Sequence, residues 1–93
     1  MGWRTALTTW YYLATVRVLL IDDDSQLLAE LATLLGKAGH EVTAHEHAVM
    51  GFEAALHGTF DVVITDINMP ELDGLTLCKR LRDRGATVPL VML

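Results

Sequence analysis

Short apolar runs alternate with amphipathic stretches along most of this chain. The apolar runs predict strands over residues 17–21, 41–45, 61–65 and 88–93. Between them, leucine and alanine recur at helical spacing and predict helices over residues 25–38, 48–56 and 75–84. Such short connections favour right-handed crossovers between neighbouring strands. The order of elements therefore predicts an α/β fold with a doubly wound parallel sheet.

Residues with special capping or backbone roles mark the ends of these elements. Asp24 or Ser25 is the expected N-cap of the first helix, and Asp73 is that of the third. Gly39 follows the first helix at the position where a left-handed backbone is common, and Gly85 is the expected stop of the third helix. These signals support the helix boundaries independently of the apolar pattern.

Two of the strands differ in polarity. Residues 41–45 mix polar and apolar side chains, which is typical of an edge strand. Residues 61–65 form a nearly continuous apolar run, which predicts a strand buried on both faces. Gly51 makes the helix over residues 48–56 the weakest of the three.

Length and composition narrow the range of functions. Ninety-three residues make one domain at most, and a chain with 52% hydrophobic and 20% charged residues is globular in composition. The formal net charge of −5 argues against direct binding of nucleic acid. A single cysteine, Cys78, fits a reducing compartment, so we expect a cytoplasmic protein.

Residues 1–15 form a leader of unknown role. Residues 5–16 are uncharged and include Trp10, Tyr11 and Tyr12, but twelve residues are too few to span a bilayer, which needs roughly 20. The start of the chain faintly resembles a signal peptide but has no clear cleavage site. The alternatives are a leader of foreign origin and a short interaction arm, and we expect no membrane association.

Acidic residues follow two of the predicted strands. Asp22 and Asp23 come directly after the first strand, and Asp66 follows the third. In a parallel sheet both strands end at the same edge, where such folds place their sites. Taken singly, an aspartate at such a position is more often a helix-terminal or loop residue. Together, the carboxylates predict a site for Mg²⁺, which prefers hard oxygen ligands.

The same arrangement is suited to phosphoryl transfer. A carboxylate can attack phosphorus and form an acyl phosphate, and a cation offsets the negative charge that gathers there. Asp66 is the candidate nucleophile, with Asp22 and Asp23 anchoring the cation. We expect Gly74 to permit the turn into the third helix.

Two segments resemble the receiver domain of two-component response regulators. They are residues 18–24, VLLIDDD, and residues 61–74, DVVITDINMPELDG. The resemblance covers residues 16–93. It implies a flavodoxin-like sheet with strand order 2-1-3-4-5. Of this fold the chain would hold strands 1–4 and helices 1–3, a partial receiver truncated at its C-terminal side.

The resemblance also implies roles for individual residues. Asp66 would accept a phosphoryl group from a sensor histidine kinase. Asp23 and Asp66 would bind Mg²⁺ through their side chains, Asn68 through its backbone carbonyl, and Asp22 through a bound water. The family's Ser or Thr after strand 4 and its Lys on strand 5 would fall beyond Leu93.

Three functions remain open from the sequence. The first is a phosphorelay receiver, whose partners would be a sensor histidine kinase and an output domain or a second copy of the chain. The second is an inactive receiver that acts only as a protein-interaction module. The third is an enzyme with an aspartate nucleophile, such as a phosphatase. That enzyme needs a general acid and a substrate cap, and neither is evident, so we expect no enzymatic activity.

Overall fold

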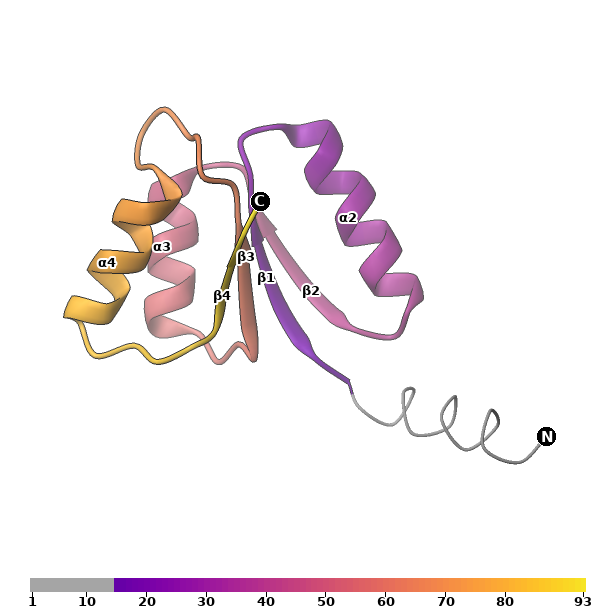
Figure 1. Ribbon diagram of the computed structural model, residues 1–93. Helices are drawn as coiled ribbons and strands as arrows, with labels where there is room; N and C mark the ends of the chain where they lie inside the picture. Colours follow the sequence, from indigo (N-terminus) through magenta and orange to yellow (C-terminus); the bar gives the residue numbers. More distant parts are fainter. Residues whose placement is uncertain (1–14) are drawn as a thin grey trace.

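The computed structural model describes residues 15–93, and the expectations for the leader lie outside the described residues. Strands and helices alternate strictly along this part of the chain (Figure 1). The elements are β1 (Arg17–Ile21), α2 (Ser25–Lys37), β2 (Glu41–His45), α3 (Ala48–His57), β3 (Val62–Thr65), α4 (Gly74–Asp83) and β4 (Leu90–Met92). All seven predicted elements are confirmed. Within residues 15–93, no helix is long and apolar enough to cross a membrane.

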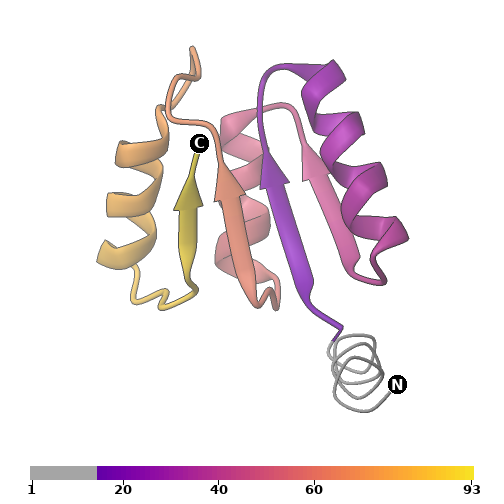
Figure 2. The same cartoon turned by 45° about the vertical axis from the view of Figure 1, so that its right-hand side comes forward.

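The four strands form one parallel sheet in the order β2-β1-β3-β4 (Figure 2). In the register, Leu20 of β1 lies opposite Ala44 of β2 and Ile64 of β3, and Ile64 in turn lies opposite Val91 of β4. The α/β prediction and the edge position of β2 are therefore confirmed. The strands β1 and β3 lie side by side in the middle of the sheet.

Helices cover both faces of the sheet, with α3 and α4 on one side and α2 on the other (Figures 1 and 2). The larger core joins the face of α3 and α4 to the inner strands, and it contains Leu19, Ile21, Ala48, Phe52, Ala55, Val63, Met69, Leu72, Leu77 and Leu81. The smaller core lies under α2 and contains Val18, Leu20 and Leu28. Alternate residues of β1 enter opposite cores, because side chains along a strand point to opposite faces.

The prediction that β3 is buried on both faces is wrong for one of them. Val63 and Thr65 are fully buried under α3 and α4, whereas Val62 and Ile64 are only half-buried. The helix on their side, α2, packs over β1 and β2 and leaves β3 partly uncovered. Next to Ile64, Val91 is 46% exposed.

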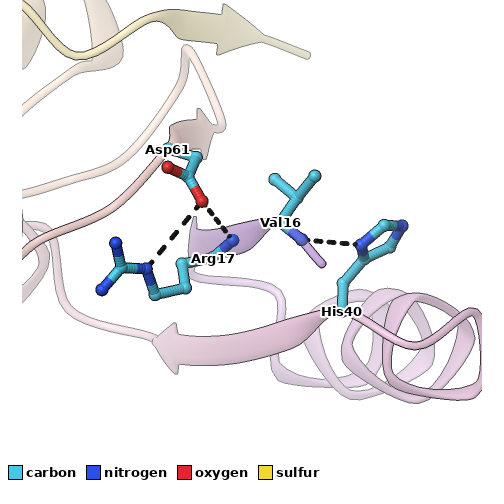
Figure 3. A network of polar contacts seen from close by, with 4 residues as sticks. All are labelled: Val16, Arg17, His40 and Asp61. Carbon is cyan, nitrogen blue, oxygen red and sulfur yellow. Dashed lines mark hydrogen bonds and ion pairs between the residues drawn. The ribbon is translucent and has the colours of Figure 1, made fainter. Parts of the chain in front are cut away.

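Two side chains tie the start of β1 to its neighbours (Figure 3). The backbone N–H of Arg17 donates to Asp61 Oδ2 at 2.8 Å, and Arg17 Nε lies 3.9 Å from the same oxygen. On the other side, the N–H of Val16 donates to His40 Nδ1 at 3.2 Å. Asp61, which the apolar pattern placed inside the third strand, instead precedes β3 and anchors β1.

The predicted helix ends are confirmed. The Asp24 side chain caps α2 by accepting from two backbone N–H groups, and Asp73 caps α4 by accepting from the N–H of Thr76 at 2.8 Å. Gly39 and Gly85 have positive φ angles of 94° and 84°. Gly51 allows α3 to approach β1, because a Cβ there would lie 2.7 Å from the Ile21 side chain.

Candidate metal centre

Three carboxylates converge at the carboxyl edge of the sheet. Asp22 and Asp23 directly follow β1, and Asp66 directly follows β3, the neighbour of β1 in the sheet. One oxygen from each carboxylate lies within 4.8 Å of the other two. The structure thus brings together the three acidic residues that the sequence predicted would meet. Among residues 15–93, this is the one group of His, Cys, Asp and Glu side chains close enough to hold a metal ion.

The electrostatics of Asp22 indicate an uncompensated negative charge. Its side chain is buried, and the residue is only 4% exposed. This burial raises the pKa of Asp22, an effect that the hydrogen bond from the Asp24 N–H opposes. The charges of Asp66, Asp23 and Asp24 raise the pKa further. A cation shared by these carboxylates would offset the cost of burying the Asp22 charge and the repulsion between the three side chains. The donor set therefore fits Mg²⁺.

Asp66 lies at the point where the chain leaves β3. Its N–H donates to the Ile21 carbonyl at 2.9 Å, which extends the pairing of β1 with β3 by one residue. Its Oδ1 accepts from the N–H of Asn68 at 3.3 Å, so the carboxylate also shapes the loop that follows. Asn68 therefore lies next to the cluster, and a metal contact through its carbonyl stays a prediction.

Gly74 has a different role from the one the sequence suggested. Its φ is not positive, so glycine is not needed there to permit a turn. Instead, a Cβ at this position would lie 2.5 Å from the carbonyl oxygen of Asp66. The Gly74 N–H also donates to the Ile67 carbonyl at 2.8 Å. Glycine is needed because the loop after β3 folds back onto its own start.

A groove of about 190 Å³ opens beside the carboxylate cluster. Its lining residues come from three loops at this edge of the sheet and are Asp23, Glu46, His47, Ala48, Met69, Pro70 and Glu71. His47 Nδ1 lies 3.6 Å from Glu71 Oε1 across the groove. Sequence reasoning missed this contact, because the two residues are distant in the chain and neither belongs to a recognisable motif.

Comparisons with known proteins identify the family. The sequence profile described as the response regulator receiver domain matches residues 18–93. The chain belongs to the response regulator receiver domain family. This match includes all seven strands and helices that the structure describes, and it begins one residue after the start of β1 at Arg17.

Relatives of this receiver are consistent in sequence and fold. Response regulator MprA of Mycobacterium sp. (strain KMS) is 33% identical over 78 residues, which are 84% of this chain and 34% of MprA. The chain thus spans about a third of that relative. The receiver domain of Francisella response regulator 1452 has a TM-score of 0.81 at 27% identity, over 84% of this chain and 64% of that one.

A third comparison concerns a receiver with a metal. Response regulator TrrA from Thermotoga maritima, solved in complex with Mg(2+)-BeF, has a TM-score of 0.78 at 26% identity. The similarity covers 84% of this chain and 68% of TrrA. The flavodoxin-like receiver fold is therefore shown. The described residues supply four parallel strands and three helices of this fold, and the chain spans about two thirds of each of these solved structures.

Proposed function

We propose that this receiver accepts a phosphoryl group on Asp66 from a phosphohistidine of a sensor histidine kinase, with the help of Mg²⁺. The observation that carries the proposal is the convergence of Asp22, Asp23 and Asp66 at the ends of two adjacent central strands. A lone aspartate in a loop would be a weak nucleophile for an anionic group. Here two further carboxylates stand ready to hold the cation that phosphoryl transfer needs.

In the proposed reaction, a carboxylate oxygen of Asp66 attacks the phosphorus atom of the donor. An O–P bond forms and the P–N bond of the phosphohistidine breaks. The ring nitrogen keeps the electron pair of that bond, and the imidazole leaves as the neutral ring because its other nitrogen already carries a proton. Bound Mg²⁺ would supply positive charge to offset repulsion between the carboxylates and the phosphoryl oxygens. Asp22 and Asp23 would hold the ion together with Asp66, and Asn68 would add its backbone carbonyl.

The family supports the same role. MprA is described as a response regulator, and TrrA was solved with Mg(2+)-BeF. By analogy we propose a sensor histidine kinase as the donor, an output domain or a second copy as the receiving partner, and the cytoplasm as the location. We propose an acceptor that is phosphorylated once, rather than an enzyme that turns over a substrate.

The test is the intact mass of the protein after incubation with acetyl phosphate, with and without Mg²⁺. We expect a gain of one phosphoryl group that requires Mg²⁺ and is absent in Asp66→Asn. The matched control is Asp83→Asn, which changes an exposed aspartate of α4 that pairs only with Lys79 across the helix surface. We expect this control to be phosphorylated like the unchanged protein.

A folded protein that gains no phosphoryl group would contradict the proposal. The alternative function would then apply, in which this receiver acts only by binding other proteins. Phosphorylation that persists in Asp66→Asn would instead move the acceptor to another residue.

A further inference from the structure

Thr65 places a polar group inside the larger core. The residue is 0% exposed, and it shares its face of β3 with Val63, which packs against the buried leucines of α4. A buried hydroxyl costs free energy unless it is hydrogen-bonded. Valine has almost the same shape without that cost, so packing alone does not explain a threonine at this position.

The hydroxyl of Thr65 forms a hydrogen bond where β3 leads into the carboxylate cluster. Its Oγ1 donates to the backbone carbonyl oxygen of Asp66 at 3.1 Å. The same carbonyl oxygen is approached by Gly74, where a Cβ would lie 2.5 Å away. The N–H of Asp66 is held separately by the Ile21 carbonyl at 2.9 Å. Both backbone polar groups of Asp66 are thus fixed by the protein interior.

The direction of this carbonyl determines where the following residues lie. The carbonyl and the next peptide nitrogen rotate together about the Cα–C bond of Asp66. A change in carbonyl direction would therefore move Ile67 and Asn68 relative to the carboxylate cluster. It would also disturb the bond of 3.3 Å from the Asn68 N–H to the Asp66 carboxylate.

We propose that Thr65 is a positioning residue, whose buried hydroxyl holds the Asp66 carbonyl and so sets the geometry of the metal-binding edge. The inference rests on the proposed function, since it assigns Thr65 a part in the Mg²⁺ site. This role requires no contact of Thr65 with the ion or with the phosphoryl group. Thr65 acts through the backbone of Asp66, in the way that outer-shell groups orient metal ligands elsewhere.

Two variants separate positioning from packing. Thr65→Val keeps the side-chain volume and removes the hydroxyl whose hydrogen bond the Asp66 carbonyl accepts, so we expect an unfolding temperature at or slightly below that of the unchanged protein. We expect its affinity for Mg²⁺, measured by calorimetry on the full chain, to fall about tenfold. Thr65→Ser keeps the hydroxyl and loses a methyl group. We expect this variant to unfold at a lower temperature and to retain its Mg²⁺ affinity.

The control is Val63→Ala, which creates a cavity on the same face of β3 without touching Asp66. We expect it to unfold earlier and to bind Mg²⁺ normally at a temperature where it is folded. Equal Mg²⁺ affinity in Thr65→Val and the unchanged protein would overturn the role of Thr65 alone. Equal losses in Thr65→Ser and Thr65→Val would do the same. Failure of the unchanged protein to bind Mg²⁺ would overturn the proposed site, and this inference with it.

Discussion

Asp22 is the most buried of the clustered carboxylates, and its environment disfavours its charge. Burial raises its pKa, and the neighbouring aspartates add to the effect. The folded state therefore binds a proton at Asp22 more tightly than the unfolded chain does. Stability falls as the pH rises from the aspartate pKa of the unfolded chain through the raised pKa of the folded state, and above that pKa the cost is fully present when no cation is bound.

We predict that Asp22→Asn stabilises the metal-free protein at neutral pH. The asparagine oxygen can still accept the N–H of Asp24, now at 3.0 Å from Asp22 Oδ1, while the repelling charge is removed. The same change should weaken Mg²⁺ binding at least about tenfold. Urea unfolding with and without Mg²⁺ measures both effects. A variant that is less stable than the unchanged protein without Mg²⁺ would contradict the argument.

Asp73 behaves in the opposite way. The hydrogen bond from the Thr76 N–H, supported by the Thr76 hydroxyl, lowers the pKa of Asp73. Its contribution to stability is therefore present above the aspartate pKa of the unfolded chain and is lost as the pH falls through the lowered pKa. We predict that Asp73→Asn, which keeps the cap but not the charge, is less stable at neutral pH. The difference should close in strong acid, and unfolding curves from strongly acidic to neutral pH test this. A difference that stays constant with pH would count against the charge of Asp73.

At the scale of elements, local patterns predicted the fold well. Strands and helices were recognised from apolar spacing, and Asp24, Gly39 and Gly85 were placed correctly because caps and left-handed turns depend on neighbouring residues. The exposed face of β3 was not predicted, because the apolar run at residues 62–65 does not tell which helix covers it. Burial of that face depends on where α2 lies.

The sequence predicted the members of the carboxylate cluster but not the contacts that support it. The meeting of Asp22, Asp23 and Asp66 followed from the rule that parallel strands end together. The hydrogen bond of the Thr65 hydroxyl and the close approach of Gly74 did not, because the first depends on the orientation of one buried side chain and the second on a loop that folds back onto its own start. A single sequence carries no signal for contacts of that kind.

Gly74 and Gly36 offer a matched pair of substitutions within helices. We predict that Gly74→Ala destabilises the protein by about 1–3 kcal/mol, because its Cβ would press on the Asp66 carbonyl. A Cβ at Gly36 would meet no neighbouring side chain within 4 Å, and Gly36→Ala should stabilise by about 0.5–1 kcal/mol. Thermal unfolding of both variants tests the pair. If the two substitutions change the unfolding temperature alike, the loop after β3 can shift to accommodate the Cβ of Gly74→Ala.

At the scale of the whole molecule, one face of the sheet is only partly covered. Val62 and Ile64 are only half-buried against the smaller core, and Val91, beside Ile64 on the same face, is 46% exposed. In the described part of the chain, β4 pairs with β3 alone, so its outer edge has no strand partner. Apolar surface next to an open strand edge favours association between molecules.

We predict that this receiver self-associates as its concentration rises and that Val91→Lys weakens the association. The matched control is Val49→Lys on α3, because Val49 is 50% exposed and Val91 is 46% exposed. The control should associate like the unchanged protein. Sedimentation velocity over a range of concentrations measures both variants. If both substitutions weaken self-association equally, the added positive charge, and not the loss of Val91 from the interface, explains the effect.

The pairing of β1 with β3 determines when a newly made chain can first bind a metal ion at the carboxylate cluster. Arg17 and Asp61, which meet at the start of this pair, are separated by 44 positions. A nascent chain that has left the ribosome only as far as β2 already contains Asp22 and Asp23, yet it lacks Asp66, the third carboxylate of the cluster. The binding edge therefore forms only after β3 has been made and has paired with β1.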